Sequence, residues 1–595
     1  MHTDSPWLPL SSSARGIYLA AVMAPENPRY NTAEVLELPG DTDMHLLRRA
    51  LEQFYAENEG VRVRTRVHAG RAEQQVLPIE KFLSTVQVFE EYSLEGFDSE
   101  DSESSGGEGE LPLPVLSWAR VLLSEPLNTD KGVTLRSAYT RYAGKIWFYH
   151  SISHVVADGF AAFNGLSRIA AIYRTLAAGK EALPTARPGV AELIAADEAA
   201  APAREADLEF WLSPEQAHVL EEPDSSLAGR SAEASPAALR VSLAVPVELQ
   251  TRLLSAAKEK GASWPHLATA VVGSFLARIA NRESAAFGVP QMNRMLPPSV
   301  DPATRDLAKI SAQTACTAVN VLPVQVPSLG SLEHAIERVK QDFERNAQHP
   351  LARQEDLERA ARTNDARLFG AQINVVPFDA VLPISTPEPL SAEERAAGVR
   401  PEPPATARIH NISAGPVPDM TVTLRGMPGR GNPIALEIDA NPALYTPEIL
   451  RAHASHLADW FRKWTIALEN NLPLEALSTA TDAELAVLDS FNAPEHPVEY
   501  RTLLQRFVAA VNAHPEQVAL RAAAPARRAD GSFGLTPEDT QAYDFSQELN
   551  YIQLDYRARV LAAELIGAGV RPGDAVGLRV ERGIEQYVAL YALSV

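Results

Sequence analysis

The chain reads Ser151-Ile152-Ser153-His154-Val155-Val156-Ala157-Asp158-Gly159-Phe160 in the stretch that best predicts its fold. The residues just before it, 145–152, are rich in aromatic and branched side chains and favour a strand. Apolar residues then recur at helical spacing from Phe160 until Gly179 can end the helix. We therefore expect His154 on a turn between a strand and a helix, where a rigid scaffold presents a side chain to a cleft.

Three interpretations of His154 follow from the residues alone. In a continuous helix, His150, His154 and Asp158 would share one face and resemble a set of metal ligands. The aromatic run before His154 favours a strand, which would scatter these side chains. A second interpretation is a buried structural histidine. The third is a general base, since an imidazole with a pKa near 6.5 can exchange protons close to neutral pH.

A resemblance to a known family favours the third interpretation. Residues 154–159 resemble the HHxxxDG motif of condensation domains of nonribosomal peptide synthetases, with Ser153 in place of the first histidine. Further matches follow in the family's order: Pro9–Tyr18, Val61–Arg64, Asp207 with Phe210-Trp211, Gly288–Pro290 with Arg294, Asn320 with Leu322-Pro323, Leu368–Gly370 with Asn374, and His410–Val417 with Asp419. Together they are specific, and they cover about residues 5 to 465.

Composition is consistent with a large globular protein. A chain of 595 residues is too long for one core, and 46% apolar content allows several packed lobes. No run approaches the roughly 18 apolar residues of a membrane span, and no secretory signal is visible. The net charge of −22 argues against nucleic-acid binding. Cys316 is the single cysteine, which fits a reducing cytoplasm.

The resemblance implies an α/β fold. Two lobes resembling chloramphenicol acetyltransferase, each a mixed sheet flanked by helices, would form a V-shaped pseudo-dimer. We expect an N-lobe over residues 1–182, an inter-lobe linker over 183–205, a C-lobe over 206–470, a second linker over 471–500, and a further piece over 501–595. Residues 98–110 are expected to be a solvated acidic loop, and residues 383–404 an insertion rich in Pro and Glu. A helix opened by Thr446-Pro447 should bury an apolar stripe, namely Ile449, Leu450, Leu457, Phe461 and Trp464.

The last segment looks like the beginning of an adenylation domain. The residues that carry this resemblance are Leu503–Phe507, His514-Pro515, Val518–Leu520 and Leu549–Leu554, with Gln553 where glutamate is usual. The sequence ends at Val595 before any phosphate-binding loop of that family. We expect a truncated N-terminal fragment with no adenylation activity. Its apolar residues Val576, Leu578, Val580, Val588, Leu590 and Leu593 are expected to be exposed.

The resemblance also implies the reaction. An amine on one carrier-bound aminoacyl thioester attacks the acyl or peptidyl thioester on a second carrier protein, and an amide forms. Both substrates arrive on phosphopantetheine arms, so no directly bound cofactor and no metal are expected. The expected partners are the donor and acceptor carrier proteins. We expect a monomer that binds neither nucleic acid nor membrane.

The resemblance assigns roles to individual residues. His154 would hold the amine or remove its proton, and Gly159 would offer a backbone N–H to the developing oxyanion. Asp158 would form a structural ion pair with Arg62, and Ser153 would be a further structural residue of the motif. Tunnel or substrate-proximal positions are expected at Asn320, Asn374, Ser413 and Gly415.

Two other functions stay open at this point. A non-catalytic relative that binds carrier proteins or recruits a partner enzyme is favoured by Ser153, whereas His154 and Gly159 argue against it. A free-standing acyltransferase that uses coenzyme A thioesters is disfavoured by the adenylation-like segment. Residues 158–160, 369–374 and 410–416 look most like those of siderophore synthetases, which join an aryl or acyl donor to an amino acid.

Overall fold

The computed structural model describes two compact units, residues 1–485 and 486–595, which are treated separately below. Within them it describes residues 5–86, 88–95, 97, 111–220, 226–229, 232–233, 235, 237–360, 368–378, 381–386, 404–429, 434–492, 500–525 and 543–595. The expected acidic loop at 98–110 and most of the expected insertion at 383–404 lie outside the described residues.

The first lobe is built on a six-stranded mixed sheet. Its strand order is β12 (Val381–Pro383), β13 (Thr406–Asn411), β2 (Asn31–Pro39), β7 (Lys145–Ser153), β6 (Leu135–Tyr142) and β5 (Val88–Glu91). Every residue of β7 after Lys145 is buried, as expected for a central strand covered on both faces. Ala143 and Gly144, both with positive φ, form the tight turn that joins β6 to β7. The expected strand before His154 is therefore confirmed.

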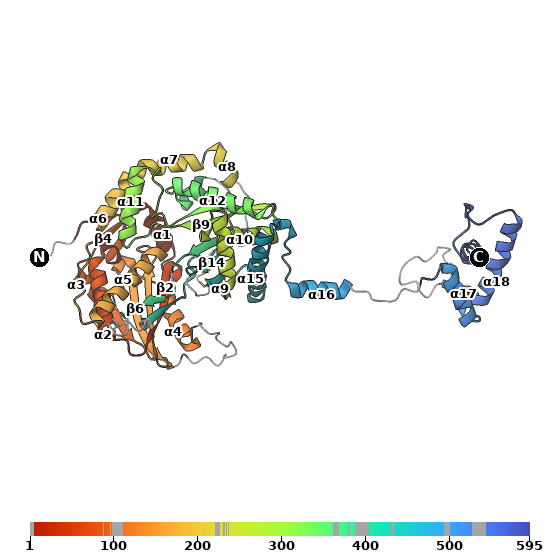
Figure 1. Cartoon of the computed structure of the whole chain (residues 1–595), viewed down its shortest axis with the longest axis horizontal. Helices are drawn as coiled ribbons and strands as arrows, with labels where there is room; N and C mark the ends of the chain where they lie inside the picture. Colours follow the sequence, from red (N-terminus) through yellow and green to blue (C-terminus); the bar gives the residue numbers. More distant parts are fainter. Residues whose placement is uncertain are drawn as a thin grey trace, which may run out of the picture. The chain divides into compact units, whose positions relative to one another are not determined.

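Helices cover both faces of this sheet (Figure 1). The first face packs on α2 (Met44–Glu57) and α5 (Gly159–Ala177) in one apolar core. The opposite face packs on α4 (Leu113–Ser124), where the Trp118 ring meets Tyr149 edge-on. A small sheet of β1 (Leu8–Pro9), β4 (Arg71–Val76) and β3 (Val63–His68) completes the lobe with α1 (Ser12–Met23) and α3 (Ile79–Thr85).

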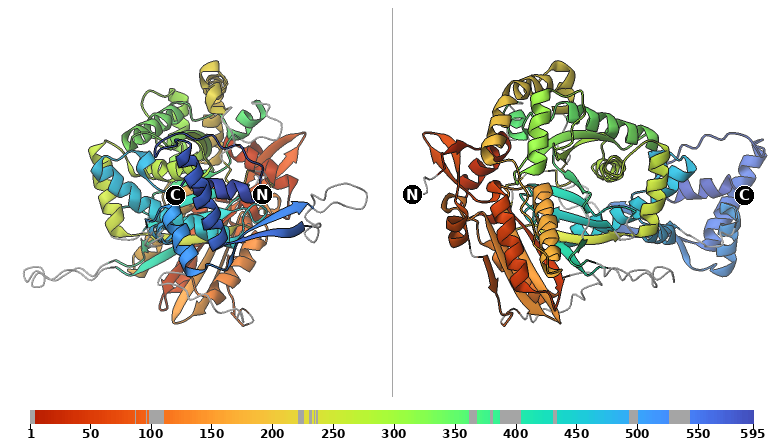
Figure 2. Two further views of the ribbon diagram at one scale, coloured as in Figure 1. Left: turned by 90° about the vertical axis from the view of Figure 1, so that its right-hand side faces the viewer. Right: turned by 60° about the vertical axis from the view of Figure 1, so that its left-hand side comes forward.

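The second lobe has a six-stranded sheet of its own (Figure 2). The order is β10 (Asn320–Pro327), β9 (Ser284–Gln291), β11 (Gln372–Val376), β14 (Met420–Arg425), β15 (Ile434–Ala440) and β8 (Leu239–Val245). One face forms the largest apolar core of the molecule with α9 (Val247–Glu259), α10 (Trp264–Ile279), α12 (Leu332–Gln348) and α15 (Pro447–Asn470). Two lobes of mixed sheet and flanking helices confirm the expected α/β fold.

The strands do not follow the boundary that the sequence predicted between the lobes. β12 and β13 lie within the range expected for the C-lobe, yet they extend the sheet of the first lobe, where β13 pairs with β2. Residue numbers alone could not reveal this exchange, because strand partners are chosen by tertiary packing. The expected linker at 183–205 also contains regular structure: α6 (Val190–Ala199) and the start of α7 (Ala201–Trp211).

The apolar stripe expected on the last long helix is mostly confirmed. The Thr446 side chain caps α15 by accepting a hydrogen bond from the Ile449 N–H, at 3.3 Å. Leu450, Leu457, Phe461 and Trp464 are buried in the second lobe. Ile449 is 46% exposed instead, because it lies on the solvent side of the first turn. Among its described residues, this unit also contains α8 (Pro214–Leu220), α11 (Pro302–Gln313) and α13 (Gln354–Ala360). The division between the two units falls within α16 (Asp482–Asn492).

The C-terminal unit has a small core of its own. It contains α17 (Leu503–Ala513), the hairpin of β16 (Val518–Pro525) and β17 (Tyr543–Asn550), α18 (Tyr551–Gly567) and α19 (Ile584–Ala592). Phe507, Leu554, Ile584 and Val588 are buried together. Val588 was expected to be exposed, and that expectation is wrong because α19 turns it towards Phe507. The other five expected positions are 37–45% exposed.

No helix of the described chain combines the length and the apolar character that crossing a membrane requires.

Candidate active site

The turn between β7 and α5 is fixed at both backbone atoms of His154. The His154 N–H donates to the Tyr30 carbonyl at 2.7 Å, and the His154 carbonyl accepts from the Thr317 hydroxyl. Tyr30 belongs to the first lobe, whereas Thr317 precedes β10 of the second. Both lobes therefore hold the backbone of this one residue.

The His154 imidazole is only partly exposed, and no neighbouring residue of the described chain hydrogen-bonds to its buried Nδ1. Burial lowers the pKa of His154, the Asp158 carboxylate opposes this shift, and the Arg353 guanidinium adds to it. The ring is therefore neutral near pH 7 and able to accept a proton. Because β7 is a strand, the helical spacing that would gather His150, His154 and Asp158 around a metal does not exist. Among the described residues, no group of three or more His, Cys, Asp or Glu is placed to hold a metal ion.

Asp158 holds the start of α5 against the second lobe. Its Oδ1 accepts from the Ala161 N–H at 3.1 Å and caps the helix. Its Oδ2 forms an ion pair with Arg294 Nη1 at 2.8 Å and accepts the N–H groups of Ala318 and Val319 at 2.9 and 3.0 Å. Burial opposes ionisation, but Arg294 and these donors outweigh it and lower the pKa of Asp158.

The expected ion pair between Asp158 and Arg62 is wrong. Arg62 Nη1 donates to the Leu77 carbonyl at 2.5 Å, and Nη2 lies 4.0 Å from Glu59 Oε1. Arg62 therefore ties together strands of its own lobe, whereas Arg294 approaches Asp158 from the second lobe. Arg294 was noted in the sequence as a motif residue, but its partner is 136 residues away and no local pattern connects them.

Ser153 and Asn320 make hydrogen bonds within the protein, whereas Gly159 borders open space. Ser153 is buried at the end of β7, and its Oγ accepts from the Val155 N–H at 3.4 Å. The Asn320 side-chain amide donates to the carbonyls of Pro350 and Ala352 at 3.1 and 2.6 Å. Gly159 is exposed, and a Cβ on it would meet no protein atom within 4 Å. Packing within the protein therefore does not require glycine at position 159.

Three further candidates lie on the second sheet and on the crossover to the first. Asn374 is half-buried on β11, in register with Thr423 of β14. Ser413 Oγ accepts from the Ala33 N–H at 3.1 Å, beside β2. Gly415 has a φ of 70°, a left-handed conformation that favours glycine. No hydrogen bond within the described part of the chain connects these three residues to His154.

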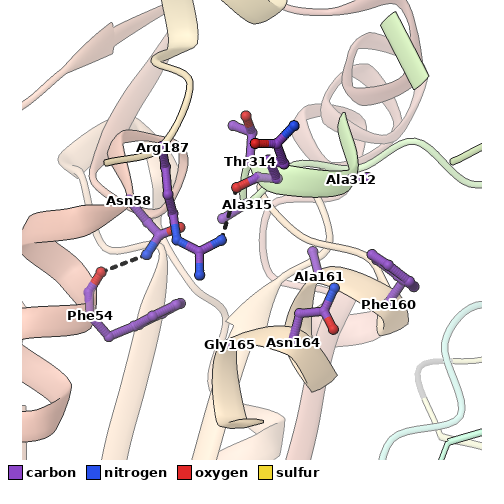
Figure 3. Close-up of a pocket in the computed structure, with 11 residues that line it drawn as sticks. Phe54, Asn58, Phe160, Ala161, Asn164, Gly165, Arg187, Ala312, Thr314 and Ala315 are labelled. Carbon is purple, nitrogen blue, oxygen red and sulfur yellow. Dashed lines mark hydrogen bonds between the residues drawn. The ribbon is translucent and has the colours of Figure 1, made fainter. Parts of the chain in front are cut away.

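A small pocket lies beside the first turn of α5, at the seam between the lobes (Figure 3). Phe160, Ala161, Asn164 and Gly165 of α5 line it, together with Phe54, Asn58, Arg187 and residues 312–315. The Arg187 guanidinium crosses the seam and donates to the Gln313 carbonyl at 2.9 Å. On α5 itself, the Phe160 ring meets the Arg294 guanidinium at 4.6 Å and Phe378 at 5.9 Å.

Thr317, Arg353 and Arg187 were not identified from the sequence. Each acts through a backbone carbonyl of the other lobe or of a distant loop. Such contacts leave no spacing signal, so only the assembled lobes reveal them.

The profile of the condensation-domain family matches residues 6–488. This chain belongs to the condensation-domain family. The family's members are amide-forming acyltransferases of nonribosomal peptide synthetases that act on carrier-bound thioesters.

Curated relatives match almost the whole chain. A dimodular nonribosomal peptide synthase of Bacillus subtilis is 24% identical over 98% of this chain and 22% of its own length. An isonitrile lipopeptide synthase of Streptomyces coeruleorubidus is 25% identical over 98% of this chain and 35% of its own length. Enterobactin synthase component F of Escherichia coli is 25% identical, over 99% and 40% respectively. The chain thus spans well under half of the length of these relatives.

Solved condensation domains share the fold. The first condensation domain of the calcium-dependent antibiotic synthetase, in complex with a substrate analogue, has a TM-score of 0.66 at 22% identity, over 80% of this chain and all (100%) of that one. A mutant starter condensation domain of rhizomide synthetase, with C8-CoA and Leu-SNAC, has a TM-score of 0.64 at 21% identity, over 79% and 97%.

Proposed function

We propose that this chain catalyses condensation with His154 as the residue that handles the amine. The observation that carries the proposal is a neutral, partly exposed imidazole on a turn whose backbone is held by both lobes. A neutral ring can accept a proton from the attacking amine, and such catalysis typically contributes about 10²–10⁴-fold.

The reaction needs little more from the protein. A thioester is already activated, so an uncharged amine attacks its carbonyl carbon once the two are held close together. Placement of this kind is worth on the order of 7–11 kcal/mol in favourable cases. The new C–N bond forms, the C–S bond breaks, the amine proton leaves through His154, and the donor carrier's thiol is released. The amide product stays on the acceptor carrier.

We propose that the Gly159 N–H donates a hydrogen bond to the developing oxyanion. It opens α5, where backbone N–H groups are not used within the helix. The space that a side chain would fill beside it contains no protein atom within 4 Å. That open space supports a role for glycine in admitting substrate, with its N–H available to the tetrahedral intermediate.

The proposed partners are a donor and an acceptor carrier protein, each with its substrate on a phosphopantetheine arm. We propose no directly bound cofactor, a monomeric chain, and a cytoplasmic location, for which the single cysteine is the support. We propose a siderophore pathway in which an acyl or aryl group is joined to an amino acid, and the similarity to enterobactin synthase component F supports it.

Residues 501–595 are proposed to be the start of an adenylation domain. The relatives match 98–99% of the chain, so the similarity continues beyond the condensation domain. Asn550 and Gln553 form a reciprocal cap at the start of α18, within the segment that carries the adenylation resemblance.

The second candidate is a degenerate condensation domain that only binds carrier proteins. Ser153, in place of the first motif histidine, is the observation that favours it. Its buried Oγ supports the turn, which is compatible with either function.

Single-turnover amide formation between two loaded carriers distinguishes the candidates. We expect the native chain to form the amide, and His154→Ala to slow it by at least about a hundredfold. His45→Ala, which changes an exposed histidine on α2, is the control and should keep the native rate. Carrier binding without amide formation by the native chain would identify the degenerate domain, and an unchanged rate in His154→Ala would exclude His154 as the proton acceptor.

A further inference from the structure

A short segment of the second lobe, residues 317–320, contacts the catalytic turn of the first. The Thr317 side chain is 3% exposed, and its hydroxyl donates to the His154 carbonyl. The N–H groups of Ala318 and Val319 both donate to Asp158 Oδ2. Three consecutive residues of one lobe therefore bond to two residues of the turn.

The opposite side of this segment is also fixed. Arg353 Nη1 donates to the Val319 carbonyl at 2.9 Å and to Ser13 Oγ of the first lobe at 3.3 Å. The Asn320 amide binds two carbonyls of the loop that leads to Arg353, and the Gln354 N–H returns a bond to Asn320 Oδ1 at 3.3 Å. The segment therefore lies between the catalytic turn and a second bonded loop, with little freedom to move.

The Thr317 hydroxyl is the contact of this segment with His154 itself. His154 lies in a turn, outside β7 and α5, so its carbonyl belongs to no strand or helix ladder. A buried carbonyl that loses its donor is costly, and a turn can relieve that cost by moving. A shift of the turn would displace the imidazole from the reacting atoms.

We propose that Thr317 is a positioning residue for condensation, which sets the place of His154 from the second lobe. The proposal rests on the function proposed above and extends it to a residue that touches no substrate. It makes the geometry of the reacting imidazole depend on correct closure of the two lobes against each other.

The electrostatics around His154 supply an independent readout. The backbone of His154, whose carbonyl Thr317 binds, raises the pKa of the His154 ring against the larger effect of burial. Asp158 acts in the same direction and Arg353 in the opposite one, and these two are paired with Arg294 and Glu355 respectively. Without the Thr317 hydroxyl, the carbonyl is free to interact more strongly with the ring, so the pKa of His154 should rise.

The test compares Thr317→Val and Thr317→Ser by single-turnover amide formation with loaded carriers. Valine keeps the size of the side chain and removes the hydroxyl, whereas serine keeps the hydroxyl. Thr465→Val is the matched control, since the Thr465 hydroxyl is equally buried and donates to the Phe461 carbonyl at 2.8 Å, inside α15. Thr317→Ala is the second variant if valine is not accepted at the seam.

We expect Thr317→Val to slow amide formation by about tenfold at saturating carriers, because small misplacements of reacting groups are costly. Half-saturating carrier concentrations should not change, and the midpoint of the pH–rate profile should move upward. Thr317→Ser should return to within about twofold of the native rate. Thr465→Val should keep the native rate, because the Phe461 carbonyl lies within α15 and far from the turn at His154.

Three results would overturn the inference: equal rates in Thr317→Val and Thr465→Val, no recovery in Thr317→Ser, or a loss confined to the half-saturating concentration. The native chain and His154→Ala are measured in parallel. If the native chain forms no amide, the proposed function fails and this inference with it. If the native chain is active and His154→Ala is not, the result for Thr317 bears on the inference alone.

Discussion

The turn at His154 and the C-terminal unit are stabilised in opposite ways. At the turn, His154 and Asp158 receive hydrogen bonds from residues far away in the sequence, and Asp158 is 2% exposed. The C-terminal unit packs a small core around Phe507 and leaves many large apolar side chains open, for example Tyr556 at 70% exposure. A site that must hold reacting groups needs the first kind of support, whereas an open apolar surface is suited to packing against further structure.

The strongest test of the turn removes its buried ion pair. Asp158→Ala or Arg294→Ala should each cost about 3–5 kcal/mol in the free energy of unfolding, since each leaves a charge buried without its partner. The double variant should lose less than the sum of the two single losses. Urea unfolding of the full chain measures all three.

Arg62→Ala is the control for this pair, because Arg62 contacts its own lobe at Leu77. Its loss should add to that of Asp158→Ala without coupling. Additive losses for Asp158 and Arg294 would contradict the assigned ion pair.

A smaller effect is expected from acid. Burial lowers the pKa of His150 to about 4, so this ring stays neutral in the folded chain well below pH 6.5, and burial lowers the pKa of His154 in the same direction. The unfolded chain takes up protons at these residues near pH 6.5. Stability should therefore fall as the pH drops below about 6.5, by up to about 1.4 kcal/mol per pH unit for His150.

Urea unfolding at several pH values between 7.5 and 5 measures this slope. His150→Gln cannot titrate, so its slope should be smaller by one proton. Equal slopes in the native chain and His150→Gln would show that His150 is not held neutral by the fold.

The smallest effect is expected from removing the C-terminal unit. A chain ending at Asn492 keeps both lobes and their cores. Its urea midpoint and its condensation rate should match those of the full chain, and its solubility should be higher because exposed apolar side chains are lost. A lower midpoint in the shorter chain would show that the first unit depends on the second.

The sequence predicted features that are local and missed those that depend on the assembled lobes. The strand before His154 and the helix after it were predicted, because periodicity and the residues that end a helix act over a few positions. The assignment of Arg62 to Asp158 was wrong, because the true partner, Arg294, reaches the turn from another lobe.

The same reason explains the strands and the supporting residues that were missed. β13 was assigned to the wrong lobe, since nothing within residues 406–411 specifies β2 as the neighbouring strand. Thr317 acts on a backbone carbonyl, which every residue possesses, so no residue pattern identifies it. The positions of Asn374, Ser413 and Gly415 relative to a bound substrate stay predictions.

The exchange of β13 into the first sheet has a consequence for how the protein is made. Until Asn411 has left the ribosome, β2 is an unpaired edge of a sheet whose strands β5, β6 and β7 are already synthesised. At 5–20 residues per second, this interval lasts on the order of half a minute. An open sheet edge is a template for pairing with other chains. The nascent first lobe is therefore most exposed to misassembly during translation. Its sheet is completed only by β13, a strand encoded much later in the message.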